Sequence, residues 1–422
     1  MKLDFQIIGG GLIGLSTAYA LIKRGASVRI IEAREGIALE TSFANAGMVH
    51  ASLADPWNGP GVGRRLLGSI FGLPSPMILR LQALPSVTTW GLKFLKHATP
   101  ARHWHATKAN YQLANYSVNL IQNWREELNI EDDYQGLGLL KVFRDAPTLA
   151  KASALTNKLQ ALGLKAEYIT GEEAAVKEPC LGPVTDRLAG AIYYPEDYKA
   201  DAYAFCQGLA TEIKRLGGEI LTGVFVKALL SERGKVIGAG ADAGDLCANT
   251  TIIAAGAHST HVLRPQGVKL ALRPVKGYSL TFEDILDENQ TAPKLPVVDD
   301  ALHCAVTPLG KSIRIAGTAE ITGYNRSMPN ARLRPLLEML RAVYPELSQN
   351  IPLEDGIAWH GFRPVSADGM PFIGHVKPGL AINTGHGHMG WTMSAGSGEL
   401  LANLLLGTST ELEASAFNPS RN

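Results

Sequence analysis

The chain contains few cysteines and no long apolar run. Its 422 residues include only four cysteines, which are far apart and form no CxxC pair: Cys180, Cys206, Cys247 and Cys304. This spacing favours reduced, mostly buried thiols over a disulfide framework or a zinc site. No uncharged apolar run reaches the roughly 18 residues that a membrane-spanning helix needs. We therefore expect a soluble or peripheral protein without a metal site.

Strong net charge is also missing. The formal net charge is +1, which argues against a strongly basic protein that binds nucleic acid. Hydrophobic residues make up 46% and charged residues 19%, as in an ordinary globular protein, and the length favours two intertwined domains over one. The first apolar run begins within the first few residues, so no cleavable leader is expected. These features predict a cytoplasmic protein.

Acidic residues are absent from residues 56–125. Eight basic residues lie there: Arg64, Arg65, Arg80, Lys93, Lys96, Arg102, Lys108 and Arg125. Apolar residues recur beside them at helical spacing: Leu66, Leu67, Ile70, Phe71, Val87, Trp90, Phe94 and Leu95. One interpretation is peripheral contact with an anionic membrane, on the cytoplasmic face of the inner membrane. The other is a helical lid whose apolar faces pack on the domain beneath it.

A glycine-rich turn near the start carries the clearest functional signal. The apolar run of residues 5–8 leads into Gly9-Gly10-Gly11-Leu12-Ile13-Gly14. Gly9 permits a tight turn, Gly11 leaves room for a pyrophosphate, and Gly14 lets the next helix pack closely on its strand. The free N–H groups at the start of that helix can hold phosphates. The turn therefore predicts a dinucleotide site.

The context of the turn strengthens this prediction. A helix is expected over residues 12–24, a second strand over residues 28–31, and Glu32 ends that strand. An acid at this place can accept hydrogen bonds from ribose hydroxyls. The alternative is an ordinary glycine-rich turn beside a surface glutamate.

A second glycine pattern lies near the end of the chain. A strand is expected over residues 380–383, a turn over 384–390 and a helix over 391–406. Gly385-x-Gly387-x-x-Gly390 fits the same spacing, but the 32 residues that follow are too few for a second nucleotide unit with its acid. We expect a helix N-terminus that faces the ligand of the first turn and stabilises negative charge on it. A single complete fingerprint also argues against a flavoprotein that binds NADPH.

The remaining pattern mixes helices and strands without an internal repeat. Helices are expected over residues 108–128, 149–162, 201–216 and 333–343. Strands are expected over residues 135–143, 188–194, 219–230, 236–241, 251–256 and within 268–325. The predicted class is a mixed α/β fold.

With these residues in hand, the chain resembles the FAD-dependent D-amino acid oxidase superfamily, and within it the small subunit of bacterial D-amino acid dehydrogenases. The motifs that carry the resemblance are Glu40-Thr41-Ser42-Phe43-Ala44-Asn45-Ala46-Gly47, Pro56-Trp57-Asn58-Gly59-Pro60-Gly61-Val62, Lys276-Gly277-Tyr278-Ser279-Leu280, Gly361-Phe362-Arg363-Pro364 with Asp368-Gly369-x-Pro371-x-x-Gly374, and Asn383-Thr384-Gly385-His386-Gly387 with Gly390-Trp391-Thr392. Motifs in this order along nearly the whole chain are far more specific than the first turn alone.

The resemblance implies non-covalently bound FAD and two domains. A Rossmann-like FAD-binding domain would be built from residues 1–60, 196–258 and 356–422. A sheet-rich substrate domain would take residues 61–195 and 259–355 and include the basic, apolar segment of residues 61–108. The implied reaction is oxidative deamination of D-amino acids to 2-oxo acids and ammonia, with hydride transfer from Cα to flavin N5. The electrons would pass to a quinone or another acceptor that is not oxygen.

The implied FAD-binding residues come from both ends of the chain and from its middle. They are Gly9, Gly11, Gly14, Glu32, Ala33, Arg34, Thr41, Ser42, Asn45, Ala46, Gly47, Val226, Ala255, Gly256, Gly361, Gly387, His388, Met389, Gly390, Trp391 and Thr392. His386 and His388 form an HxH pair, but no cysteine or carboxylate nearby completes a metal site. We expect this pair to line the flavin pyrimidine and expect no metal.

The candidate substrate residues combine the chemistry of an α-amino acid with the resemblance. A guanidinium binds a carboxylate through two parallel hydrogen bonds, so an arginine suits the substrate carboxylate. The resemblance implies Arg363 for this role, because the superfamily places its substrate-binding arginine in this Arg-Pro motif; the alternative is a structural arginine. His50 is a candidate acceptor for an amine proton, or a hydrogen-bonding histidine without a proton role. Tyr278 and Tyr324 are candidates for the pocket wall, or for core and rim.

Alternatives stay open at the level of function. Leu302 and His303 depart from the dehydrogenase pattern in a segment that could border the pocket, so a cyclic imino acid such as a D-proline derivative stays open as substrate. An amine oxidase of glycine, sarcosine or proline type, with oxygen as acceptor, shares the expected fold. A flavin-carrying subunit without catalysis is the third alternative.

Overall fold

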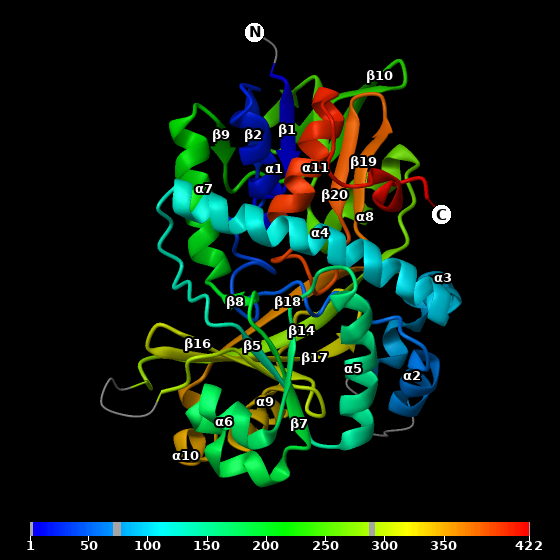
Figure 1. The fold of residues 1–422 in the computed structure, drawn as a ribbon. Helices are drawn as coiled ribbons and strands as arrows, with labels where there is room; N and C mark the ends of the chain where they lie inside the picture. Colours follow the sequence, from blue (N-terminus) through cyan, green and yellow to red (C-terminus); the bar gives the residue numbers. More distant parts are fainter. Residues whose placement is uncertain (1–2, 71–76, 287–291, 422) are drawn as a thin grey trace.

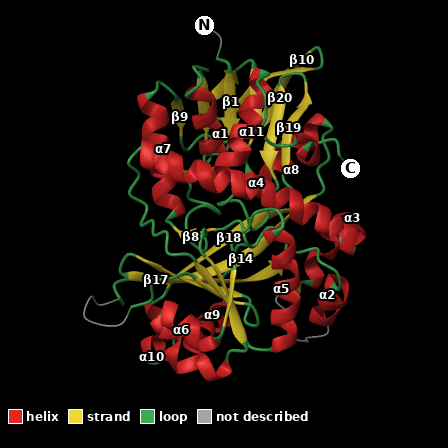
Figure 2. Cartoon of the chain, in the orientation of Figure 1, coloured by secondary structure: helices red, strands yellow, loops and turns green. Residues whose placement is uncertain are grey.

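Two main β-sheets build the protein, one in the upper and one in the lower half of Figure 1. Helices lie against both sheets, which confirms the predicted mixed α/β class (Figure 2). The computed structural model describes residues 3–70, 77–286 and 292–421. Phe71, from the predicted apolar pattern, lies outside the described residues.

The upper sheet has six strands in the order β19-β20-β13-β1-β2-β9. Its strands are β1 (Phe5–Ile8), β2 (Val28–Ile31), β9 (Glu219–Leu221), β13 (Thr250–Ile253), β19 (Phe372–Lys377) and β20 (Leu380–Thr384). All pair in parallel except β19, which is antiparallel to β20. Strand β1 is central and fully buried, as its apolar sequence requires in a sheet covered on both faces. Segments far apart in the chain thus share one sheet.

Helices and a small sheet surround these six strands. The helices α1 (Leu12–Ile22), α7 (Ala202–Arg215) and α11 (Ser394–Leu406) pack together, and the long α4 (Pro100–Glu127) crosses α11 (Figure 1). The small sheet consists of β10 (Val226–Glu232), β11 (Lys235–Ala241) and β12 (Gly244–Cys247). Asp201 caps α7 by accepting hydrogen bonds from the backbone N–H groups of Tyr203 and Ala204.

The lower sheet has nine strands in the order β18-β14-β17-β16-β15-β5-β7-β6, and β4 pairs with β17. They are β4 (Met77–Leu79), β5 (Leu139–Phe143), β6 (Glu167–Ile169), β7 (Gly190–Tyr194), β14 (Leu272–Phe282), β15 (Val297–Asp299), β16 (Cys304–Leu309), β17 (Ser312–Ile321) and β18 (Ile357–Ser366). The helices α6 (Gly171–Lys177), α9 (Asn330–Val343) and α10 (Pro345–Ser348) lie below it, and α5 (Ala146–Gln160) stands at one side (Figure 1). A short ladder of β3 (Met48–Val49) and β8 (Tyr198–Lys199) lies between the two sheets.

The remaining elements are three helices and six 3₁₀ turns among the described residues. They are α2 (Val62–Ile70), α3 (Leu84–His97), α8 (Ser259–Leu263) and the 3₁₀ turns at Leu81–Ala83, Pro179–Arg187, Gly256–His258, Arg264–Gln266, Leu353–Asp355 and Ala414–Phe417. The predicted domain limits stay a prediction. Strand β18 lies in the segment assigned to the FAD-binding domain, yet it pairs with β14 in the lower sheet.

Several element limits differ from the prediction for local reasons. Helix α4 begins eight residues earlier than expected, at Pro100, because Thr99 caps it by accepting from the Arg102 N–H. The expected strand over residues 219–230 is two strands, β9 and β10, which belong to different sheets. The last helix begins at Ser394 rather than at residue 391.

The basic, apolar segment divides into an inward and an outward face. Val87, Trp90 and Phe94 are buried in a cluster with Val275 and Val365, as the packing interpretation requires. Other leucines of the segment are exposed: Leu67, Leu81, Leu84, Leu92 and Leu95. Across the described ranges, no helix is both long and apolar enough to pass through a bilayer.

Candidate active site

The first glycine turn joins β1 to α1 in a space that admits no side chain at two positions. Gly9 has a φ of +115°, and a Cβ there would lie 2.5 Å from the Ala254 carbonyl oxygen. A Cβ on Gly14 would lie 1.8 Å from the Gly9 carbonyl oxygen. Only glycine fits either position, because the helix, the turn and β13 approach one another so closely.

Gly11, in contrast, borders open space. A Cβ there would meet only the Ser42 hydroxyl, at 3.2 Å, and no side chain caps the helix at this residue. The Glu32 carboxylate lies beside the turn and accepts from the N–H groups of Gly10 and Arg34, at 2.7 and 2.8 Å. The Leu12 N–H at the helix start donates to the Ser42 hydroxyl at 3.1 Å. A helix N-terminus that begins at a glycine and has a carboxylate beside it has the features of a site for a diphosphate and its ribose.

Other predicted cofactor residues follow the ends of neighbouring parallel strands. Ala33 and Arg34 follow β2, Ala255 and Gly256 follow β13, and the turn of residues 385–392 follows β20. The carboxyl ends of parallel strands meet at one edge of a sheet, so these turns converge there with the first glycine turn. Val226 begins β10 in the small sheet.

The C-terminal turn contributes mainly backbone and small polar groups at this edge. Met389 and Trp391 are buried in the main hydrophobic core, where the Trp391 ring packs against Phe205. Gly387 has a φ of +58°, and a Cβ there would meet no atom within 4 Å. Gly390 likewise leaves space, with His386 as its nearest neighbour at 3.7 Å.

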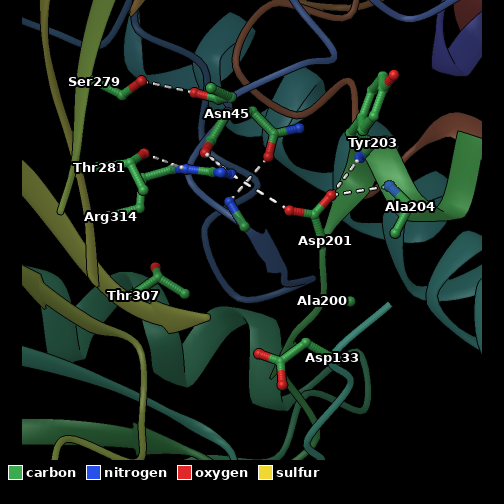
Figure 3. A network of polar contacts seen from close by, with 12 residues as sticks. Asn45, Asp133, Ala200, Asp201, Tyr203, Ala204, Ser279, Thr281, Thr307 and Arg314 are labelled. Atoms are coloured by element: carbon green, nitrogen blue, oxygen red, sulfur yellow. Dashed lines mark hydrogen bonds and ion pairs between the residues drawn. The ribbon is translucent and has the colours of Figure 1, made fainter. Parts of the chain in front are cut away.

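The turn of residues 44–47 is held by the lower sheet (Figure 3). Its carbonyl oxygens accept hydrogen bonds from three side chains of that sheet: Ser279 to Ala44 at 2.9 Å, Thr307 to Ala46 at 2.7 Å and Arg314 to Asn45 at 3.3 Å. Within the turn, the Asn45 side chain accepts from the Gly47 N–H. The lower sheet therefore fixes a turn that the motif comparison assigns to FAD.

Arg314 is central to this network. It donates to the Thr281 hydroxyl at 3.0 Å and lies 3.8 Å from Asp201, the cap of α7 (Figure 3). Burial lowers the pKa of its guanidinium, which stays charged at neutral pH. Arg314 thus connects β17, the turn and α7. Thr41 adds another link, because its hydroxyl donates to the Phe362 carbonyl of β18.

Arg363 lies on β18, on the face of the lower sheet that Ser279 turns toward residues 44–47; we call this the inner face. Its guanidinium lies against Gly277, where a Cβ would come within 2.1 Å of Nη1. It donates from Nη1 to the Thr318 carbonyl at 3.1 Å, and its Cζ lies 5.2 Å from the centre of the Trp57 ring.

Among the described residues, the Arg363 guanidinium has no acidic partner. Burial alone lowers the pKa of Arg363 to about 10, and no carboxylate pairs with it anywhere in residues 3–70, 77–286 and 292–421. A partly buried cation without a counter-ion is costly unless a ligand supplies one. The arrangement can therefore receive an anion.

A small pocket lies next to Trp57. The Trp57 ring stacks on His388 with 5.1 Å between centroids and 8° between planes, and it also contacts Arg363, so Trp57 adjoins both residues. The lining includes Trp57, Asn58, Phe94, Asn110, His386 and His388. Aromatic walls with a few neutral polar groups suit a small ligand of mixed polarity.

Two buried histidines near this pocket have ring nitrogens without a partner among the described residues. They are Nδ1 of His50 and both ring nitrogens of His386. Burial lowers the pKa of each to about 3, so both imidazoles are neutral at physiological pH. The His50 backbone N–H donates to the Thr392 hydroxyl at 3.1 Å, which brings His50 to the C-terminal turn.

Asp197 is a buried carboxylate that the sequence did not indicate. It accepts from the Ala51 N–H at 3.0 Å and from the Ser52 hydroxyl. Burial raises its pKa to about 7. Asp197 thus fixes the backbone just after His50. The one sequence signal that could have indicated Asp197 is its place as an acid directly before the buried strand β8.

The structure does not bring Tyr278 and Tyr324 to Arg363. Tyr278 points to the opposite face of β14 from Gly277, and its hydroxyl donates to Glu320 at 2.5 Å. The Tyr324 hydroxyl donates to the Ala257 carbonyl at 2.7 Å. Neither tyrosine lines the pocket. Leu302, in the segment that departs from the motif pattern, packs with the core below the lower sheet rather than beside the pocket.

The fold and the paired glycine turns define a class of protein. The chain belongs to the family of FAD-dependent oxidoreductases, whose sequence model matches residues 4–404. It is 33% identical over 416 residues to a D-amino acid dehydrogenase of Bradyrhizobium diazoefficiens, covering 98% of each chain. It is 35% identical over 416 residues to a D-amino acid dehydrogenase of Allorhizobium ampelinum, covering 98% of this chain and 97% of that one. The resemblance seen in the motifs is confirmed.

Solved structures show the same fold. Glycine oxidase from Geobacillus kaustophilus superposes with a TM-score of 0.76 at 22% identity, covering 99% of this chain and 98% of that one. L-proline dehydrogenase from P. horikoshii superposes with a TM-score of 0.77 at 20% identity, covering 100% of this chain and 97% of that one. At these identities the likeness concerns the fold alone.

The residues present fit FAD. The positions beside Gly11, Gly256 and Gly387 are open, so a flat cofactor can approach the backbone there. At the start of α1 the Leu12 N–H donates to the Ser42 hydroxyl at 3.1 Å, so a residue of the predicted FAD site already lies where a diphosphate would bind. The unpartnered imidazole nitrogens of His50 and His386 are buried where a polar ring could satisfy them.

Proposed function

We propose that this FAD-dependent oxidoreductase is an amino acid dehydrogenase that deaminates D-amino acids oxidatively to 2-oxo acids and ammonia. The chain matches relatives named D-amino acid dehydrogenase over nearly its whole length, at 33% to 35% identity. The observation that carries the proposal is Arg363, a partly buried guanidinium beside an aromatic pocket with no acidic partner among the described residues.

Arg363 suits the carboxylate of an α-amino acid. One edge of its guanidinium is engaged by the Thr318 carbonyl and one flat face by Trp57, so the fork is held in place before substrate arrives. A carboxylate that receives two parallel hydrogen bonds from this fork has a fixed orientation. Fixing the carboxylate sets the direction of the Cα–H bond, and such alignment is most of what a hydride transfer requires of the protein.

When bound, FAD supplies the hydride acceptor at its N5 atom. The residues of this chain orient the substrate and exclude water. Because burial lowers the pKa of His50 to about 3, His50 is poorly suited to hold an amine proton and is better suited to accept a hydrogen bond. The amine that reacts would then enter in its neutral form. The imine product is hydrolysed by water to the 2-oxo acid and ammonia.

Electrons would leave for a quinone or another acceptor that is not oxygen, with the protein bound peripherally to an anionic membrane. The outward leucines of α2 and α3 support this, since Leu67 and Leu92 are 61% and 67% exposed. Lys93 and Lys96 are exposed on α3, the helix that carries Leu92. No acidic residue occurs in residues 56–125. Apolar and basic side chains on one surface are typical of segments that lie on anionic lipid.

Product analysis tests the reaction. Purified protein is incubated with single D- and L-amino acids, with and without a quinone analogue, and 2-oxo acid, ammonia and hydrogen peroxide are measured. A dehydrogenase forms 2-oxo acid and ammonia from D-amino acids only when the quinone is present and makes little peroxide. Peroxide in equal amount to product would instead identify an oxidase, and no product with any amino acid would refute the proposal.

Sedimentation with vesicles tests the membrane contact separately. Vesicles of neutral lipid and vesicles with added phosphatidylserine are compared at low and high salt. We expect binding to anionic vesicles at low salt and its loss in the double variant Lys93→Glu and Lys96→Glu. If the protein stays in the supernatant with anionic vesicles at low salt, the membrane contact is refuted. That result does not bear on the proposed reaction.

A further inference from the structure

Strand β17 carries a β-bulge directly beside Arg363. Lys276 of β14 pairs with Glu320 and Tyr278 pairs with Gly317, so the single residue Gly277 faces two residues, Thr318 and Ala319. Bulges of this kind re-aim side chains and occur next to active sites. This one lies opposite Gly277, the glycine over which the Arg363 guanidinium lies.

The bulge forces Thr318 into a strained backbone. Its φ is +59°, and Thr318 is the one β-branched residue with a positive φ among the described residues. A β-branched side chain at such a φ is a true outlier, because its Cβ substituents crowd the backbone. Glycine takes this conformation without strain. A threonine here costs stability, which suggests that its side chain serves another purpose.

The side chain of Thr318 has no hydrogen-bond partner within the part of the chain that the structure describes. Its hydroxyl oxygen is buried and makes no hydrogen bond among the described residues. Its carbonyl oxygen, in contrast, accepts from Nη1 of Arg363 at 3.1 Å. The same residue therefore contacts the guanidinium through its backbone carbonyl and also carries a buried hydroxyl that lacks a partner among the described residues.

We propose that the hydroxyl of Thr318 donates a hydrogen bond to the substrate carboxylate that Arg363 holds, which makes Thr318 a specificity-determining residue. A carboxylate has about four lone-pair sites, so it can accept two bonds from the guanidinium and a third from a hydroxyl. A ligand paired with Arg363 brings its oxygens next to Thr318, because the Thr318 carbonyl already touches that guanidinium. The inference rests on the proposed function, in which Arg363 binds an amino acid carboxylate.

Three variants separate the hydroxyl from the strain. Thr318→Ser keeps the hydroxyl, Thr318→Val keeps the branched shape without it, and Thr318→Gly removes both the hydroxyl and the strain. Thr156→Val is the matched control, because the Thr156 hydroxyl is buried and has a partner in Tyr194 at 3.1 Å. Each holoenzyme is titrated anaerobically with a D-amino acid, and the Kd and the limiting rate of flavin reduction are measured. Unfolding temperatures are recorded in parallel.

We expect Thr318→Val to raise the Kd about tenfold or more, the loss of one hydrogen bond to a charged group. Thr318→Ser should stay within a few-fold of the wild type. Thr318→Gly should raise the Kd and the unfolding temperature together, a combination that a purely structural threonine would not produce. Thr156→Val should lower the unfolding temperature and leave the Kd unchanged.

A second titration identifies the group contacted. The carboxylic acid that lacks the amino group, and the amine that lacks the carboxylate, are each titrated against the flavin absorption of the wild type and Thr318→Val. The proposal is supported if Thr318→Val binds the acid more weakly than the wild type does but binds the amine equally well. The proposal is overturned if the wild type and Thr318→Val bind the acid with the same Kd and also bind the D-amino acid with the same Kd. If no amino acid reduces the wild type, the proposed function fails, whereas the acid titration still decides whether Thr318 contacts a carboxylate.

Discussion

Replacing Arg363 by lysine tests the proposed carboxylate site most specifically. A lysine side chain can carry a positive charge, but it has no planar fork and cannot reproduce the contacts of the guanidinium with the Trp57 ring and the Thr318 carbonyl. Burial lowers the pKa of Arg363 to about 10, and a lysine amine in the same place starts from a lower ordinary value, so its charge is less secure.

The size of the effect follows from the bonds lost. A hydrogen bond to a charged group contributes about 1.5–3 kcal/mol, and each 1.4 kcal/mol is tenfold. Losing one of two parallel bonds to the substrate carboxylate should therefore weaken substrate binding by roughly 10- to 150-fold. FAD content should not change, because the Arg363 guanidinium contacts Thr318, Trp57 and Gly277 rather than the first glycine turn.

The assay is an anaerobic reduction titration of wild type, Arg363→Lys and Arg341→Lys. Arg341 is the matched control, since it pairs with Glu338 on the surface helix α9. The Kd for the D-amino acid should rise in Arg363→Lys only, with an unchanged ratio of flavin to protein. A Kd that does not change in Arg363→Lys, whatever its FAD content, would refute the assignment of Arg363 to the substrate.

Three further substitutions probe the surrounding structure. Gly277→Ala places a Cβ 2.1 Å from Nη1 of Arg363, so the guanidinium must move, and the KM should rise at least tenfold, by about 1.4 kcal/mol or more, while FAD stays bound; a normal KM would contradict this geometry. Gly11→Val should fold, because only Ser42 is near, but purify without FAD, as the visible spectrum will show; a normal flavin content would argue against diphosphate binding there. Asp197 has a folded-state pKa of about 7, above its unfolded value near 3.8, so the protein loses stability as the pH rises from about 4 to 7 and the loss is complete above that range. The difference in unfolding temperature between Asp197→Asn and the wild type should therefore change across this window, and a difference that is constant with pH would contradict the buried carboxylate.

The first βαβ unit could be predicted because its signals are local. The apolar residues of β1, the glycines of the turn and the acid at the end of β2 lie within about thirty residues, the length of such a unit. Short-range sterics then determine the structure: Gly9 and Gly14 touch atoms of their own unit or of the adjacent strand. The cap of α7 by Asp201 is local in the same sense.

The strand pairing of the lower sheet, and which of its two faces is the inner face, could not be predicted in the same way. Tyr278 was a candidate for the pocket wall, and alternation along β14 does place it opposite to Gly277, but only the pairing with β17 and β18 decides which face is the inner one. The bulge at Thr318 likewise arises from register between two strands about forty residues apart. No residue pattern within β17 indicates this bulge.

Trp57 and Asp197 were missed for a related reason. Trp57 belongs to a motif that the sequence analysis singled out, yet its role depends on contacts with Arg363 and His388, which come from distant parts of the chain. Asp197 is distinguished by its burial and its bonds to Ala51 and Ser52, which only the fold brings near it. Both lie where segments far apart in the sequence meet.

The central claim is that the glycine turns at both ends of the chain hold one FAD, beside an arginine that binds an amino acid. The most direct measurement is the visible absorption of the purified protein during anaerobic titration with D-amino acids. The account predicts a yellow protein whose flavin absorption is bleached by at least one D-amino acid with a saturable Kd. A protein that takes up no flavin, or whose bound flavin stays oxidised with every amino acid, would contradict it.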